Sequence, residues 1–145
     1  MGDNIEATLK ELFPEMSIEC RQIFGVPNFK VGAENLLEVC EKLHKELGFD
    51  YLADITAIDW NDRIEVVYQL TNLPSNCRIA LRVDLDRDNP EIDSLCSLWK
   101  GADFQEREVF DLMGVVFSGH PDLRRILLPS DWDGHPLRKD YVISD

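Results

Sequence analysis

The sequence contains no Cys-x-x-Cys pair, and its four cysteines, Cys20, Cys40, Cys77 and Cys96, are never closer than nineteen residues. This spacing argues against a zinc or iron–sulfur site, so we expect reduced, mostly buried thiols in a cytosolic protein. The start of the chain has no basic stretch followed by an apolar run, so no secretory signal is expected. No apolar run approaches the roughly 18–20 residues of a membrane span, so any membrane contact is expected to be indirect, through another subunit.

Positive charge is scarce as well. Lys and Arg total 15 against 28 Asp and Glu, which gives a net charge of −13. The phosphates of nucleic acids and of anionic lipids would repel such a chain, which excludes both as expected partners. The negative charge is unevenly distributed: residues 118–145 hold 4 basic and 5 acidic residues, whereas residues 1–117 hold 11 basic and 23 acidic residues. This contrast indicates a core domain over residues 1–117 and an arm over 118–145 that lies against another surface.

Periodicity of the apolar residues predicts the elements of the core domain. Helical spacing predicts helices over residues 3–13, 33–47, 90–101 and 103–114, the last begun by a capping box of Asp103 and Glu106. Alternation predicts strands over residues 16–24, 49–58, 64–70 and 77–85, and a short strand over 115–117. The strands over 64–70 and 77–85 are expected to form an antiparallel hairpin with one solvated face. The predicted fold class is α+β: a mainly antiparallel mixed sheet packed against helices, with an extended C-terminal arm.

The arm loses this periodicity. Pro121, Pro129 and Pro136 interrupt it, and Gly-His-Pro occurs twice, each time followed closely by Leu-Arg. Such a segment favours an extended path over helix or sheet.

The helix before the arm is rich in charge. Glu106, Glu108 and Asp111 could act as acid–base carboxylates. However, Arg107 and Asp111 are four residues apart on a helix and can pair, and a carboxylate that faces an arginine stays ionised. We therefore favour a structural or interfacial role, and keep a stand-alone acid–base or metal-dependent enzyme as the remote alternative.

His120 and His135 each lie between a glycine and a proline. Imidazole is a common metal ligand, but no cysteine or third histidine lies near them in the sequence, so we expect their rings to dock in pockets or to hydrogen-bond the backbone. No glycine-rich phosphate-binding loop accompanies the basic residues of the arm. Arg124, Arg125, Arg138 and Lys139 could pair with the domain's own acidic surface or with carboxylates of a partner, and the nearby Trp132 and Tyr141 favour the partner.

Residues 106–127 resemble the signature of the C subunit family of proton-pumping NADH:quinone oxidoreductase, respiratory complex I. The matching positions are Glu106-Arg107-Glu108, Asp111, Leu112-Met113, His120, Arg124 and Ile126-Leu127. A downstream block over residues 131–141 and the strand motif over 55–60 are similar to further parts of the family, so that the likeness covers roughly residues 49–141. Val142 stands where the family often has proline, and the chain is shorter than many respiratory relatives, which leaves the parent complex open.

The resemblance implies a non-catalytic subunit of the peripheral arm of the complex, on the cytoplasmic side of the membrane. It implies no cofactor in this chain, with iron–sulfur clusters and quinone held by partner subunits. The expected partners are the large quinone-site (D-type) subunit and neighbouring iron–sulfur subunits. The equivalent subunit of a membrane-bound nickel–iron hydrogenase or of a coenzyme-F420 dehydrogenase is the alternative. The residues expected to bind partners are Glu106, Arg107, Glu108, Asp111, His120, Arg124, Arg125, Trp132, His135, Arg138, Lys139, Asp140 and Tyr141.

Overall fold

A computed structural model describes residues 5–142. Its elements in chain order are α1 (Ile5–Leu12), β1 (Glu19–Ile23), β2 (Val26–Lys30), the 3-10 helix η2 (Ala33–Asn35), α2 (Leu36–Lys45), β3 (Tyr51–Asp59), β4 (Ile64–Asn72), β5 (Cys77–Leu85), β6 (Glu91–Asp93), α3 (Ala102–Met113) and β7 (Val116–Ser118). In this described part, no helix is long and apolar enough to cross a membrane.

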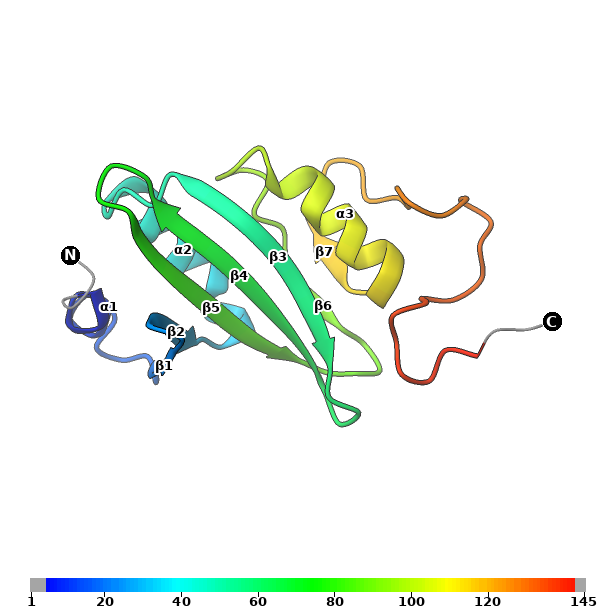
Figure 1. The fold of residues 1–145 in the computed structure, drawn as a ribbon, viewed down its shortest axis with the longest axis horizontal. Helices are drawn as coiled ribbons and strands as arrows, with labels where there is room; N and C mark the ends of the chain where they lie inside the picture. Colours follow the sequence, from blue (N-terminus) through cyan, green and yellow to red (C-terminus); the bar gives the residue numbers. More distant parts are fainter. Residues whose placement is uncertain (1–4, 143–145) are drawn as a thin grey trace.

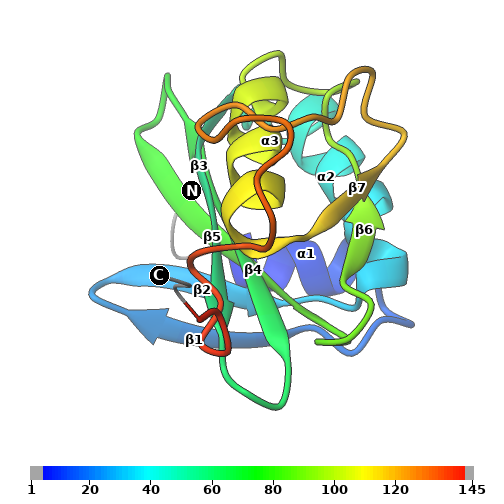
Figure 2. The same ribbon diagram turned by 90° about the vertical axis from the view of Figure 1, so that its right-hand side faces the viewer.

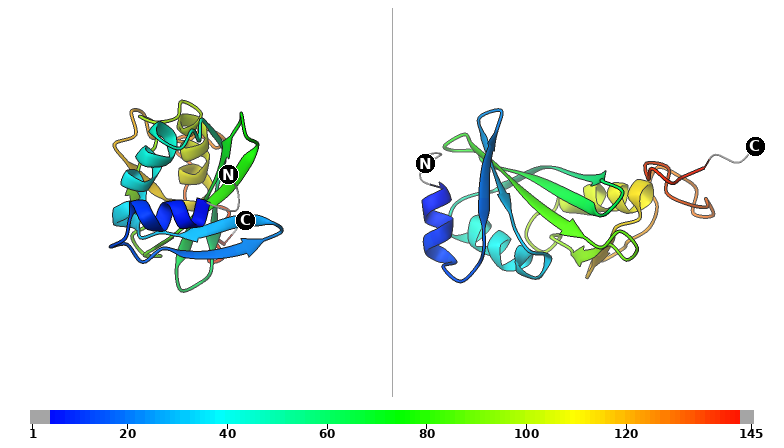
Figure 3. Two further views of the ribbon diagram at one scale, coloured as in Figure 1. Left: turned by 90° about the vertical axis from the view of Figure 1, so that its left-hand side faces the viewer. Right: turned by 90° about the horizontal axis from the view of Figure 1, so that it is seen from below.

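A five-stranded sheet in the order β1-β2-β5-β4-β3 forms the centre of the fold. Only β2 and β5 pair in parallel among its strands, so the prediction of a mainly antiparallel α+β fold is confirmed. Helix α2 lies behind this sheet and α3 lies beside β3, while the short parallel pair β6–β7 forms a second sheet (Figures 1 and 2). The molecule is elongated, with α1 and the β1–β2 hairpin at one end and residues after β7 at the other (Figures 1 and 3).

The alternating strands behave as the sequence predicts. Ile64, Val66, Tyr68 and Leu70 of β4 are buried in the core, and β5 pairs with β4 in an antiparallel register from Cys77 opposite Asn72. The other face of β4 is drier than expected. Glu65 has a side chain only 5% exposed there because it accepts hydrogen bonds from Lys30, Arg82 and Trp60 of the surrounding elements.

Strand β2 was not expected, because Pro27 interrupts its sequence. The pair Ile23–Val26 closes a two-residue turn, and Pro27 lies opposite Gln22 at the next position. Paired positions of antiparallel strands alternate between hydrogen-bonded and non-hydrogen-bonded, so Pro27 takes a position where no N–H is needed. Pairing with β5 begins only at Asn28, beyond the proline.

The prediction of a helix over residues 90–101 is wrong. Strand β6 (Glu91–Asp93) occupies its start, and turns follow. Ile92, Leu95 and Trp99 are buried as helical spacing suggested, but they reach the core from a strand and a single turn. The N–H of Leu95 donates to the Glu106 carboxylate instead of to a helical carbonyl. A carboxylate of the next helix, that of Glu106, thus overrides the helical spacing of residues 90–101.

The four cysteines are free, with Cys40 and Cys77 buried and the other two half-buried. After β7, residues 119–142 contain turns and bends but neither helix nor strand. This segment runs beside the C-terminal end of α3 and is called the arm below (Figure 2).

Candidate functional site

Glu106 points from α3 into the protein, where its side chain is completely buried. Its Oε1 accepts a hydrogen bond of 2.6 Å from Ser94 Oγ, and its Oε2 accepts one of 2.7 Å from the Leu95 N–H. The capping box predicted with Asp103 is therefore wrong, since α3 begins after Gly101 without a side-chain cap. Glu106 instead fixes the turn that precedes the helix.

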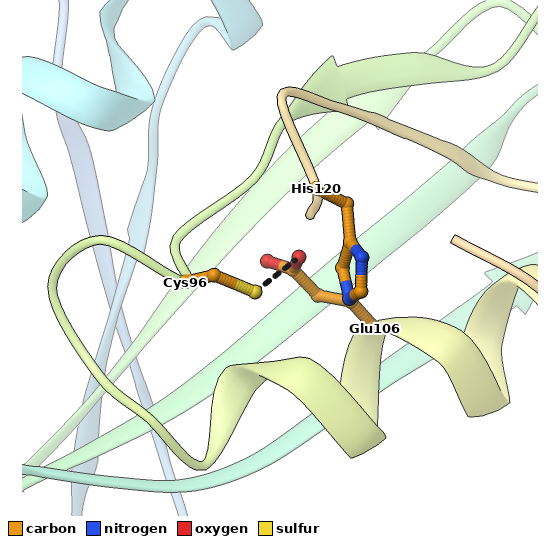
Figure 4. Close-up of side chains that lie close together, drawn as sticks. All are labelled: Cys96, Glu106 and His120. Atoms are coloured by element: carbon orange, nitrogen blue, oxygen red, sulfur yellow. Dashed lines mark hydrogen bonds between the residues drawn. The ribbon is translucent and has the colours of Figure 1, made fainter. Parts of the chain in front are cut away.

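Cys96 and His120 lie on either side of this carboxylate (Figure 4). Burial raises the pKa of Glu106, although the hydrogen bonds from Leu95 and Ser94 offset part of that effect. Burial also raises the pKa of the Cys96 thiol to about 11, and the thiol lies 3.4 Å from Glu106 Oε1. A thiol in this state is protonated at neutral pH, which suits a hydrogen-bond donor and not a nucleophile.

The hydrogen bonds of His120 decide whether these three residues can hold a metal. Its Nδ1 accepts a hydrogen bond of 2.9 Å from the Asp122 N–H, so the ring proton must lie on Nε2. Nε2 donates a hydrogen bond of 3.2 Å to the Asp103 carbonyl oxygen, and it lies 3.1 Å from Asp103 Oδ1. The nitrogen that faces the cluster therefore has no free lone pair for a metal. The ring, 0% exposed, ties the start of the arm to α3.

Asp111 is the second buried carboxylate of α3, and it organises the arm. Its Oδ2 accepts hydrogen bonds from three consecutive arm amides, those of residues 126–128, at 2.7–3.1 Å. Its Oδ1 pairs with Arg125 Nη1 at 2.7 Å, and the two side chains are 0% and 11% exposed. Burial alone would raise the pKa of Asp111, but Arg125 and the three amides lower the pKa below its usual range.

The expected pair of Arg107 with Asp111 does not form. The guanidinium of Arg107 lies 5.4 Å from the centre of the Phe104 ring, and its Nε is 3.4 Å from the Arg124 carbonyl oxygen. Asp111 takes Arg125 because Arg125 also reaches the carbonyl oxygens of Trp132 and Gly134, at 3.1 and 2.7 Å. One guanidinium thereby closes the first loop of the arm.

The arm also satisfies the carbonyl groups that end α3. The last carbonyls of any helix have no partner within the helix and carry the negative end of its dipole. Here the Asp111 carbonyl accepts from Arg125 and from His135 Nδ1 (3.0 Å), the Leu112 carbonyl from the Leu137 N–H (3.0 Å), and the Met113 carbonyl from Arg138 Nε (2.6 Å). Basic side chains thus bind where the dipole favours positive charge.

A third carboxylate, Asp59 at the end of β3, holds the far part of the arm. Arg87 donates to both of its oxygens at 2.9 and 2.8 Å, and the Lys139 N–H donates at 2.9 Å. Arg138 Nη1 donates to the carbonyl of Arg87 at 3.1 Å. The hydrogen bonds from Arg87, despite burial, hold the pKa of Asp59 well below its usual range. Asp59 and Arg87 were not among the residues expected from the sequence, because nothing in their spacing links them to the arm.

The residues expected to bind a partner fall into two groups. One group lies inside this chain and builds the arm: Glu106, Arg107, Asp111, His120, Arg125, His135 and Arg138. The other group is exposed or half-exposed: Glu108, Arg124, Trp132, Lys139, Asp140 and Tyr141. Leu127 and Leu137, at 59% and 60% exposure, join the outer surface of the arm and were missed because apolar residues in a loop give no periodic signal.

This arrangement is poorly suited to acid–base chemistry. Each buried carboxylate of the described residues, namely Asp59, Glu65, Glu106 and Asp111, already accepts hydrogen bonds from neighbouring side chains or amides. A general base needs a lone pair directed at substrate. The site is instead a stiff, aperiodic surface whose outward side chains are apolar and charged.

Comparisons with known proteins agree on one family. Residues 29–145 match the family described as the 30 kDa subunit of respiratory-chain NADH dehydrogenase. The C subunit of the NADH-quinone oxidoreductase of Moorella thermoacetica is 50% identical over 141 residues, covering 96% of this chain and 94% of that protein. The protein of the same description from Citrifermentans bemidjiense is 41% identical over 148 aligned positions, covering 99% and 92%.

Solved structures with a similar fold include the following two. The trypsin-resistant fragment (1–134) of Nqo5 superposes with a TM-score of 0.72 at 34% identity, covering 83% of this chain and 99% of that one. A chain of the membrane-bound sulfane sulfur reductase, an archaeal respiratory membrane complex, superposes with a TM-score of 0.83 at 24% identity, covering 98% and 86%. At that identity the second likeness concerns the fold alone.

Proposed function

Because this chain belongs to the family of the 30 kDa subunit of respiratory-chain NADH dehydrogenase, we propose that it is a scaffold that docks through its arm. It is a C-type subunit in the peripheral arm of a complex-I-type electron-transfer complex, and therefore has partner subunits. Its proposed main partner is the large quinone-site (D-type) subunit, with iron–sulfur subunits next to it. In this proposal it binds no cofactor, and the clusters and quinone belong to its partners.

The observation that carries the proposal is the rigid attachment of an arm without secondary structure. Asp111 and Asp59, together with three carbonyls of α3, fix the arm at points spread over residues 125–139. A segment that is ordered before binding loses less conformational entropy when it docks. The internal contacts of the arm therefore keep it in one shape, as docking on a partner requires.

The outward side of the arm has the composition of a docking surface. Leu127, Trp132 and Leu137 are 59%, 42% and 60% exposed, in a loop that has no core of its own to bury them. Arg124 and Lys139 lie exposed beside them. Exposed apolar side chains next to arginine and tryptophan are typical of the residues that dominate binding energy in protein interfaces.

We also propose a location on the cytoplasmic side of the membrane, where the chain is held by its partner subunits and not by lipid. A net charge of −13 opposes direct docking on anionic lipid. The charge-balanced arm is the part that is free of this repulsion.

Native mass spectrometry of the gently solubilised complex tests the proposal. We would compare the full chain, a chain truncated after Leu128, and the single variant Leu137→Ser. The matched control is Leu73→Ser in the β4–β5 turn, because Leu73 is 58% exposed and lies outside the arm. We expect the truncation and Leu137→Ser to lower the fraction of the chain found in the large assembly, with Leu73→Ser unchanged. The co-purified subunits would also distinguish an NADH-linked complex from the hydrogenase or coenzyme-F420 alternatives. Equal recovery of all four chains would refute docking through the arm.

A further inference from the structure

The tip of the β1–β2 hairpin carries an aromatic residue in an unfavourable conformation. Ile23 and Val26 close a two-residue turn, and the two residues between them, Phe24 and Gly25, have φ of 51° and 77°. Positive φ at both positions defines the type I′ turn, which favours Asn-Gly because bulky L residues rarely adopt this conformation. Phenylalanine is thus a poor choice for the stability of the turn.

Phe24 is also completely exposed, at 101% of its reference accessible area. No side chain of the described residues covers the ring. Two other exposed aromatic side chains have partners: Phe104 lies under Arg107, and Trp60 donates to Glu65. Phe24 therefore combines a strained backbone with an unburied ring, and neither feature is compensated within residues 5–142.

The surroundings of the tip are basic for so acidic a chain. A hollow of about 390 Å³ opens beside Phe24, and its walls include Val26, Pro27 and Arg78. Glu6 also lines it, but its carboxylate is paired with Lys10 at 3.2 Å. Arg78 and Arg21 are both exposed, and in the described part of the chain neither pairs with a carboxylate, although acidic residues outnumber basic ones by 28 to 15. The tip thus offers one aromatic ring near two positive charges that no carboxylate of residues 5–142 pairs.

We propose that this hairpin tip is a second docking point, at which Phe24 inserts into an apolar socket on a neighbouring protein subunit whose rim is acidic. The charges of Arg21 and Arg78, which no carboxylate in the described part of the chain pairs, argue for the acidic rim, and an aromatic ring beside arginine is the usual composition of an interface hot spot. The tip lies at the end of the molecule opposite the arm (Figure 3), so one subunit bridges two neighbours or two parts of a large one. This inference requires only that the chain has partner subunits, and it stands or falls separately from docking through the arm.

The substitution Phe24→Asn tests the idea because the free chain and the complex respond in opposite directions. Asparagine tolerates positive φ, so the isolated chain should gain a Tm of about 2–4 °C. Loss of the ring should lower the fraction of the chain retained in the diluted assembly about tenfold or more. Phe24→Tyr keeps the ring and should retain most of the binding. Leu73→Asn, which removes an exposed leucine from the nearby turn, is the control and should change retention less than twofold.

Retention equal to that of the unchanged chain would overturn the proposal, and so would a fall in Tm that accompanies the loss of retention. Photo-crosslinking from p-benzoylphenylalanine at position 24, within the intact complex, identifies what covers the tip. A crosslink to a different subunit of the same assembly, weakened by Arg78→Glu, is the expected result. Crosslinks to lipid alone, to a second copy of this chain, or to nothing would each overturn it.

Discussion

Replacing Asp111 with asparagine keeps the shape of the side chain and removes its charge. The amide oxygen can still accept from the amides of residues 126–128, but the amide nitrogen then faces Arg125 Nη1, which lies 2.7 Å from the present oxygen. The amide nitrogen of the new asparagine and the Arg125 guanidinium are both donors, and they would face each other without access to water. The side chains at these positions are now 0% and 11% exposed. The substitution therefore breaks a buried ion pair without removing its second partner.

Loss of one partner of a buried pair typically costs about 3–5 kcal/mol. We expect the lower end, because Arg125 keeps hydrogen bonds to the carbonyls of Asp111, Trp132 and Gly134. The arm contributes few side chains to the core, so this penalty should appear as local opening of the arm before the sheet unfolds. A loss of about 3 kcal/mol corresponds to a roughly 100-fold rise in the open population.

Limited trypsin digestion measures this opening, because Arg124 and Arg125 lie in the segment that Asp111 holds. Cleavage there, identified by peptide mass, should accelerate roughly 100-fold in Asp111→Asn when cleavage is slow relative to closing. The control is Asp122→Asn, which removes an Asp–Arg pair of the same loop whose side chains are 59% and 68% exposed. Exposed pairs contribute about 0–1 kcal/mol, so its rate should change little. Equal rates for the two variants would refute the role assigned to Asp111.

Three further predictions concern neighbouring groups. Burial raises the pKa of Glu106 in the folded chain, so its contribution to stability is full below the unfolded pKa of about 4.3 and is lost as pH rises through the folded pKa. Glu106→Gln does not titrate, so the Tm of this variant minus the Tm of the unchanged chain should increase as pH rises above about 4.3. A decrease in this difference would contradict the prediction. Gly114→Ala should lower stability by about 1–2 kcal/mol in urea unfolding, since Gly114 has φ of 78° and a methyl group there would lie 2.8 Å from the His135 ring; an unchanged midpoint would contradict it. Arg87→Ala leaves Asp59 buried without its cation and should lose several kcal/mol of stability at pH 7. Because the folded pKa of Asp59 is depressed, the stability that the pair supplies is full above the unfolded pKa of about 3.9 and is lost progressively as pH falls from there through the folded pKa. The difference between the variant and the unchanged chain should therefore shrink steadily below about pH 3.9, and a difference that stays constant would argue against the ion pair.

The sheet could be read from the sequence because its strands alternate. Ile64 to Leu70 and Cys77 to Leu85 place apolar residues on one face at every second position, and the structure keeps that register. The errors arose where a distant group decides the local structure. Residues 90–101 have helical spacing, but the buried Glu106 takes the Leu95 N–H, and no local rule anticipates a carboxylate eleven residues away.

The site was predictable in its residue types and not in its pairings. The doubled Gly-His-Pro and Leu-Arg pointed to the arm, and the motif resemblance to Asp111, His120 and Arg124. The partner of Asp111 depends on the path of the arm, which no periodicity describes, so Arg107 was chosen in place of Arg125. The role of Asp59 could not be predicted for the same reason, since Asp59 accepts a hydrogen bond from the Lys139 N–H, 80 residues away in the sequence.

From Arg125 onward, the contacts that join the arm to the rest of the chain increase in sequence separation. Asp111 meets Arg125 across 14 residues, His135 across 24, and Asp59 meets Lys139 across 80. Loop closure becomes less favourable as the separation grows, so contacts near α3 should form first and bring the later partners within reach. During synthesis, β3 and helix α3 leave the ribosome before the arm. The arm can then pack onto these elements stepwise, starting with the contacts nearest to α3. The link to Asp59 would form last, and it would complete the shape of the arm through which we propose that the chain docks.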